Sequence, residues 1–111
     1  LPALFCNDDV LASNLEAHAK IHSDPIWRLP LWKPYENMIE GKVADLNNAA
    51  EGGYGGAITA ALFLEAFIRR EVNWVHIDLM AWNTSSRPGR PEGGEAMSIR
   101  ALFAFLKERF C

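Results

Sequence analysis

The pattern of apolar and polar positions at the start of the chain predicts an amphipathic helix. Asn7-Asp8-Asp9 supplies capping groups and an acidic first turn. Side chains suited to one buried face then follow at spacings of four, three and four, at Leu11, Leu15, His18 and His22. The predicted helix ends near Ser23.

The next segment predicts a link and a short helix. Asp24-Pro25 breaks the first helix, because a residue before proline is pushed away from the helical conformation. Ile26 to Leu31 is expected to be extended. Pro34 suits the first turn of a short helix, which Gly41 ends.

The middle of the chain predicts one buried helix and one clear strand. Val43 to Asn47 is a short extended piece, and a glycine-rich loop leads from it to Gly56. Ala57 to Ile68 is apolar all round apart from two residues, which is typical of a helix buried on several sides. Trp74 to Trp82 alternates as a strand does. One face of that strand carries Val75, Ile77, Leu79 and Ala81, and the other carries Trp74, His76, Asp78, Met80 and Trp82.

The remainder predicts a loop and a final helix. Thr84 to Gly94 contains two prolines and three glycines and is expected to be a loop. The helix after it has an apolar stripe made of Ile99, Leu102, Phe103, Leu106 and Phe110. The expected order of elements is therefore α, α, β, α, β, α.

This order indicates an α/β fold: a partial α/β/α sandwich with helices around an incomplete mixed sheet. Few strands are available, and two-stranded sheets are marginal in water. The apolar helix also needs partners on more than one side. Leu1 stands where a start methionine would, and the segment up to Phe5 is apolar. We therefore expect a chain taken from a longer one.

Charge and cysteine content exclude several classes of protein. The 111 residues carry a formal net charge of -3 with no basic block, which argues against nucleic acid as a partner. No apolar run reaches the roughly 18 residues of a membrane span. Cys6 and Cys111 form neither a CxxC motif nor a disulfide framework. A cytoplasmic protein with reduced cysteines and no membrane contact is expected.

Two features resemble ligand-binding motifs without completing them. His18 and His22 have the spacing of the HExxH zinc motif, but Ala19 replaces its glutamate and no third ligand is evident. Partly exposed helix histidines are the simpler interpretation. The loop Gly52-Gly53-Tyr54-Gly55-Gly56 could present amides to an anion at a helix N-terminus. It lacks the GxGxxG spacing and the P-loop lysine, so close packing of the helix is favoured.

The remaining polar residues do not assemble a complete enzyme. Asp78, in the middle of the predicted strand, is either a ligand or a structural anchor, and the absence of a second acid at a matching offset favours the anchor. Asp45 is similar. No serine lies in a GxSxG elbow. We expect no catalytic residue and no metal ligand in this chain.

Five segments, taken together, resemble a known family. They are Phe5-Cys6-Asn7-Asp8-Asp9, Trp27-Arg28-Leu29-Pro30-Leu31-Trp32, Ala44-Asp45-Leu46-Asn47-Asn48, Gly56-Ala57-Ile58-Thr59-Ala60-Ala61-Leu62-Phe63-Leu64 and Trp74-Val75-His76-Ile77-Asp78. In this order they resemble the end of the catalytic domain of the leucyl (cytosol) aminopeptidases, over nearly the whole chain. Residues 1–111 are accordingly expected to be the C-terminal portion of that domain, without its upstream metal-binding half.

The resemblance implies a two-metal exopeptidase that uses zinc or manganese to remove N-terminal residues from peptide substrates, as a homohexamer with an α/β/α catalytic domain. Paired metal ions polarise a carbonyl and activate water. In the family, the ligands lie mainly in an Asn-Thr-Asp-Ala-Glu-Gly-Arg segment that this chain does not contain. No metal ion is expected to bind to this segment.

The resemblance also implies three substrate-binding positions. Ala49 corresponds to a position on the leaving-residue side, and Met80 and Asn83 correspond to positions around the N-terminal side chain. The family usually has Ala-Gly where this chain has Met80-Ala81, which affects pocket size. The segment is thus expected to supply scaffold and part of the pocket and to be inactive alone. The alternative is a non-catalytic binding or assembly module that retains this half of the fold.

Overall fold

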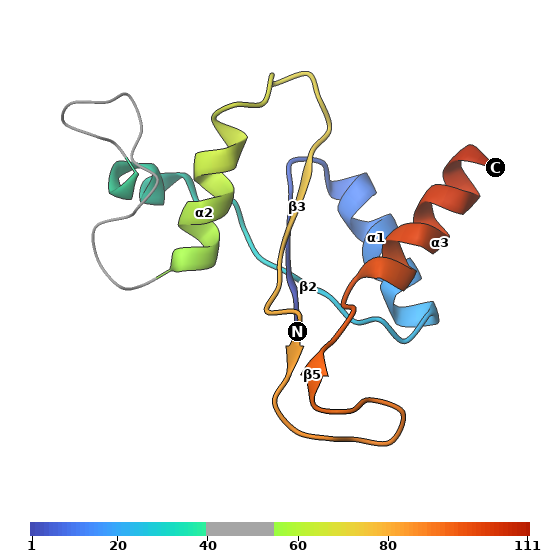
Figure 1. Cartoon of the computed structure of the whole chain (residues 1–111). Coiled ribbons are helices and arrows are strands. Elements are labelled where there is room, and N and C mark those ends of the chain that lie inside the picture. The colour runs from blue at the N-terminus through green and yellow to red at the C-terminus, as the bar shows by residue number, and fades with distance from the viewer. Residues whose placement is uncertain (40–54) are drawn as a thin grey trace.

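The computed structural model describes residues 1–39 and 55–111 (Figure 1). Its elements in chain order are β1 (Ala3–Cys6), α1 (Asp9–Ile21), β2 (Trp27–Arg28), the 3₁₀ helix η1 (Lys33–Met38), α2 (Gly56–Glu65), β3 (Val75–Asp78), β4 (Trp82–Asn83), β5 (Gly93–Gly94) and α3 (Ile99–Phe110). The four predicted helices that lie in these ranges are present, and η1 has Pro34 in its first turn as expected. The predicted strand Val43–Asn47 lies outside the described residues.

The main sheet is small and mixed. Its strand order is β2-β1-β3. Strand β1 runs parallel to β2, with Ala3 opposite Trp27, and antiparallel to β3, with Leu4 opposite Ile77. Strands β4 and β5 form a separate antiparallel pair. The predicted α/β class with a mixed sheet is confirmed.

Helices cover both faces of this sheet, which confirms the partial α/β/α sandwich. Alternation along β1 places Leu4 and Cys6 on the side of α1 and α3, in a core cluster with Leu15 and Phe105. Phe5 faces the other way and stacks on His76 at 6.0 Å. Figure 1 shows α1 and α3 on one side of the strands, and α2 with η1 on the other.

Helix α1 forms where local signals predict it. The Asp8 carboxylate accepts a hydrogen bond from the Leu11 amide at 2.7 Å, which caps the first turn. Ala12, Leu15 and Ala19 form its buried face. The helix ends at Ile21, close to the predicted end at Ser23.

The structure differs from the predicted elements in the middle and at the start of the chain. Strand β1 was not predicted, because its four residues show no long alternation and its partners lie far along the chain. The third helix ends at Glu65, before Ile68. The strand predicted from Trp74 to Trp82 ends at Asp78, because the chain turns at Ala81, whose φ is +54°. Trp82 then pairs with Gly94 in the second sheet, so strand β5 lies inside the segment predicted to be loop.

The apolar stripe predicted for the last helix does not lie in the core. Helix α3 buries Ala101 and Phe105 and packs Leu102 against the core cluster. Four residues of the predicted stripe are exposed, at 48% to 72% of their surface: Ile99, Phe103, Leu106 and Phe110. The helix therefore has a second apolar face that no described residue covers.

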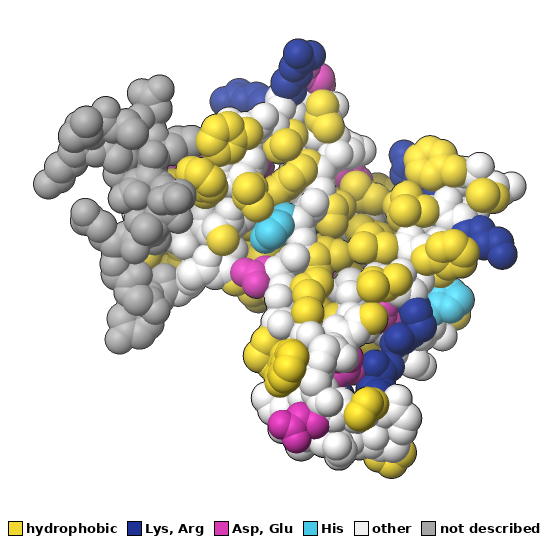
Figure 2. Space-filling view, in the orientation of Figure 1, with side chains coloured by type: hydrophobic (Ala, Val, Ile, Leu, Met, Phe, Trp, Pro, Cys, Tyr) yellow, Lys and Arg dark blue, Asp and Glu magenta, His cyan; other side chains and the backbone are white. Residues whose placement is uncertain are grey.

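Helix α2 is also only partly covered. Thr59, Ala61 and Leu62 are buried, and its packing partners among the described elements are η1 and β1. Leu64 in this helix and Phe67 just after it remain exposed. Figure 2 shows hydrophobic side chains at the surface over both α2 and α3. Residues 1–39 and 55–111 therefore cover this helix only in part, although the sequence predicted burial on several sides.

Candidate functional site

The turn after β3 presents an apolar side chain to solvent. Met80, which the resemblance places at the substrate pocket, is 68% exposed there. Ala81 follows it with φ +54°, a conformation that is costly for a residue with a Cβ. Trp82, the next residue, is about half exposed. The turn thus carries two large apolar side chains on either side of a strained alanine.

Asn83 has a different environment from Met80. It is 6% exposed, and its Nδ2 group donates hydrogen bonds to the Arg90 and Pro91 carbonyls, both at 2.9 Å. Both amide hydrogens are therefore used inside the β4–β5 hairpin. This side chain fixes the hairpin loop against strand β4.

The hairpin is closed by Glu95, which sequence reasoning did not single out. The Glu95 carboxylate accepts from Arg90 Nη1 at 2.6 Å and from Arg87 Nη2 at 3.1 Å. Its backbone amide donates to the Ala81 carbonyl at 2.9 Å. Arg87 and Arg90 also exchange two backbone hydrogen bonds of 2.8 Å. The segment predicted to be loop is therefore an ordered hairpin, and the only hint of it in the sequence is that Arg87 and Arg90 are followed by Glu92 and Glu95.

Ala49, the third predicted substrate-binding position, lies outside the described residues, as do Asp45, Asn47, Asn48, Gly52 and Gly53. The described end of the glycine-rich loop is Gly55, with φ +68°, at the start of α2. A Cβ at Gly55 would lie 3.0 Å from Cε2 of the Tyr35 ring. This close approach agrees with the packing role that the sequence favoured for the loop.

The histidine pair takes part in helix packing. His18 Nε2 lies 2.9 Å from the exposed Glu108 carboxylate, and the His18 ring packs edge-on against Phe105. His22 is exposed and stacks on His18 at 6.2 Å. In the described ranges, no three His, Cys, Asp or Glu side chains are grouped so that they could hold a metal ion. The described residues therefore do not fit a metal site.

The buried acidic anchor is Asp24, which the sequence predicted only as a helix breaker. Its carboxylate accepts from the Ser98 amide at 2.9 Å and the Ala101 amide at 3.1 Å, and so caps α3 from 74 residues away. Arg100 lies 3.6 Å from the same carboxylate and donates to the Ser23 carbonyl at 2.9 Å. The half-buried Asp78, by contrast, makes no side-chain hydrogen bond or ion pair with any described residue.

The surroundings of Asp24 favour its charged form. Burial by itself would raise the pKa, because it penalises the carboxylate. Hydrogen bonds from Ala101 and Ser98 and the positive charge of Arg100 outweigh that penalty and hold the pKa of Asp24 below its ordinary value. The residue therefore joins α1 and α3 as an ionised cap.

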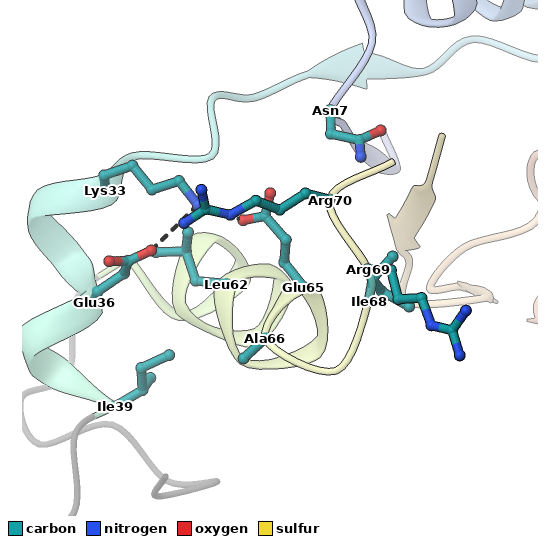
Figure 3. A pocket seen from close by; sticks show the side chains of 10 residues that line it. All are labelled: Asn7, Lys33, Glu36, Ile39, Leu62, Glu65, Ala66, Ile68, Arg69 and Arg70. Carbon is teal, nitrogen blue, oxygen red and sulfur yellow. Dashed lines mark hydrogen bonds and ion pairs between the residues drawn. The ribbon is translucent and has the colours of Figure 1, made fainter. Parts of the chain in front are cut away.

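A depression of about 480 Å³ lies between η1 and the C-terminal end of α2 (Figure 3). Lys33 Nζ bonds Glu65 at 2.8 Å and Glu36 at 3.2 Å, and the bond to Glu65 raises the pKa of Lys33. Figure 3 shows Lys33 and Arg70 reaching over the end of α2, whereas Arg69 points away from it. Among the described residues that line it, Lys33 is paired with Glu36 and Glu65, and none is a nucleophile beside a base.

Residues 1–103 match the catalytic domain of the cytosol aminopeptidase family. The chain belongs to this family. The sequence is 38% identical over 106 residues to a probable cytosol aminopeptidase of Rhodopirellula baltica, covering 94% of this chain and 21% of that protein. It is 40% identical over 109 residues to the corresponding protein of Roseiflexus castenholzii, covering 95% and 22%. The family resemblance inferred from the sequence is confirmed.

Solved structures agree with this assignment. The crystal structure of the cytosol aminopeptidase from Coxiella burnetii superposes with a TM-score of 0.95 at 48% identity, covering 99% of this chain and 24% of that chain. The bottromycin maturation enzyme BotP, in complex with Mn, gives 0.90 at 32% identity, covering 97% and 24%. The chain therefore spans about a fifth of the length of the curated relatives and represents a segment of the catalytic domain.

None of the helices in residues 1–39 and 55–111 has the length and apolarity to cross a membrane. The main features of the described surface are the exposed turn at Met80, the ordered hairpin and the uncovered apolar faces of α2 and α3.

Proposed function

We propose that this segment is the C-terminal portion of a two-metal aminopeptidase that removes N-terminal residues from peptides. The match to the cytosol aminopeptidase catalytic domain over residues 1–103 is the observation that carries the proposal. The segment supplies scaffold and part of the substrate pocket, and the upstream half of the domain supplies the zinc or manganese ligands. A cytoplasmic homohexamer is the corresponding whole protein.

The pocket part of the proposal assigns Ala49 to the leaving-residue side and Met80 with Asn83 to the side of the N-terminal residue. The exposure of Met80 supports direct contact with an apolar substrate side chain. The two hydrogen bonds of Asn83 support an indirect role, in which it holds the hairpin behind Met80. Nucleic acid and membrane have no part in the proposed function.

The alternative proposal is a non-catalytic binding or assembly module. The exposed apolar face of α3 is the observation that favours it, because such faces mark contact surfaces. Hydrolysis of a leucyl chromogenic substrate by the full-length protein that contains this segment decides between the two. Metal-dependent turnover supports the peptidase, and a full-length protein without turnover supports the module.

The 111-residue chain alone is expected to show no aminopeptidase activity with added zinc or manganese. The physical reason is that its described acidic and histidine side chains form no group that could hold a metal ion. The measurement is turnover of a leucyl chromogenic substrate, with the full-length protein as positive control. Turnover by the pure chain that a chelator abolishes would contradict the expectation.

Replacing Met80 with alanine in the full-length protein should change substrate preference. At about 25 cal/mol per Å², contact over a few tens of Å² is worth about 1 kcal/mol, or roughly a fivefold change in kcat/KM for a leucyl over an alanyl substrate. Met38→Ala, in η1, is the matched control and should leave the ratio unchanged. Equal losses for leucyl, methionyl and alanyl substrates would indicate damaged packing and not a pocket contact.

A further inference from the structure

The β4–β5 hairpin is held together from inside by one carboxylate. The Glu95 side chain is only 11% exposed, yet it accepts hydrogen bonds from two arginines, at 2.6 Å from Arg90 and 3.1 Å from Arg87. Charge-assisted bonds in a partly buried position are stronger than exposed ion pairs. Arg90 is held at both ends, because its backbone carbonyl accepts from Asn83. These bonds therefore hold Arg87 and Arg90, in the loop of the hairpin, against Glu95 just after β5 and Asn83 in β4.

Strand β4 of this hairpin directly follows the turn that carries Met80 and Ala81. The Glu95 amide donates to the Ala81 carbonyl at 2.9 Å, and Ala81 has φ +54°. An alanine keeps this strained conformation only where contacts with the surrounding residues stabilise it. The contacts that fix it on the C-terminal side are the hairpin pairs and the Glu95 bond. Loosening the hairpin should release the strained turn and let Met80 change direction.

We propose that Glu95 is a positioning residue for substrate preference. It draws Arg87 and Arg90 together, closes the hairpin, and so fixes the turn from which Met80 meets the N-terminal side chain of the peptide. Asn83 serves the same purpose through the Arg90 and Pro91 carbonyls. This inference rests on the proposed aminopeptidase function.

The test compares Glu95→Gln with Glu92→Gln in the full-length protein. Both changes remove one negative charge from the same hairpin, but the Glu92 side chain is exposed and makes no bond with a described residue. Two quantities are measured: the leucyl-to-alanyl ratio of kcat/KM, with KM and kcat separated, and hydrogen exchange of the backbone amides from Ala81 to Asn83.

Glu95→Gln should lower the leucyl-to-alanyl ratio by about threefold to tenfold, chiefly through KM, since the chemistry itself is untouched. Exchange at the Ala81–Asn83 amides should become faster by about tenfold or more as the turn opens locally. Glu95→Asp, which keeps a carboxylate, should recover part of both effects. Glu92→Gln should change neither the ratio nor the exchange.

Several outcomes would overturn the inference. If Met80→Ala shifts the ratio and Glu95→Gln shifts neither ratio nor exchange, the positioning role is wrong while the aminopeptidase function stands. If Glu95→Gln also speeds exchange in β1 and α1, the residue supports the whole fold and not the turn. If the wild-type protein hydrolyses no substrate, the proposed function fails, and unchanged exchange in Glu95→Gln would then reject the local role as well.

Discussion

Asp24→Ala is expected to lower the free energy of opening helix α3 by about 2–4 kcal/mol, because a buried donor left without its acceptor costs about 1–3 kcal/mol. Two amides, Ser98 and Ala101, lose their acceptor in this variant. The Ser98 side chain does not replace this acceptor, because Ser98 stands at the N-cap position of α3 with φ +68° and makes no capping hydrogen bond. The effect should appear in native-state hydrogen exchange of the α3 amides in the full-length protein.

The matched control is Asp9→Ala, which removes an aspartate that is 91% exposed and paired with Arg28 at 2.6 Å. Exposed pairs contribute about 0–1 kcal/mol, so this change should have little effect on α3. Asp24→Asn should fall between the two, because one acceptor oxygen remains. Similar exchange in Asp24→Ala and Asp9→Ala would contradict the capping role.

The same residue should make the stability of the fold depend on pH in the acidic range. The folded pKa of Asp24 lies below its ordinary value, so the folded state binds its proton less readily than the unfolded state does. Its contribution is fully present above the ordinary aspartate pKa and is lost as the pH falls through the lowered one. The advantage of wild type over Asp24→Asn should therefore shrink with acidification.

The 111-residue chain alone is expected to form dimers or larger species and not a monomer. In the described residues, β2 and β3 are the edges of a three-stranded sheet, and α3 exposes Ile99, Phe103, Leu106 and Phe110. Unpaired strand edges and large apolar patches promote association, by edge pairing or by exchange of elements. Light scattering coupled to gel filtration should give a mass above 12.4 kDa.

A variant can show which surface is responsible for this association. Phe103→Ser should reduce the associated fraction if α3 contributes, whereas Phe105→Ser, in the buried face, should destabilise the fold without removing the exposed stripe. A sharp monomer peak for the wild-type chain, with a cooperative thermal transition and no binding of a hydrophobic dye, would show that these residues form a self-sufficient domain.

The sequence by itself determined the family, the α/β class and the helices near their observed positions. These features depend on local patterns: Asp8 caps α1 three residues from its partner, Pro34 begins η1, and the spacing of Leu11 and Leu15 marks a buried face. Helix signals of this kind act within one or two turns, so they can be read along the chain.

Tertiary structure alone decided the features that join distant residues. Strand β1 exists because β2 and β3 pair with it, and Asp24 caps α3 across 74 positions. The sequence favoured one apolar stripe on α3, from Ile99 to Phe110, whereas packing against α1 buries Ala101 and Phe105. The turn at Ala81 and the Glu95 closure likewise arise from contacts made after the chain folds back, because a strained conformation persists only where such contacts hold it.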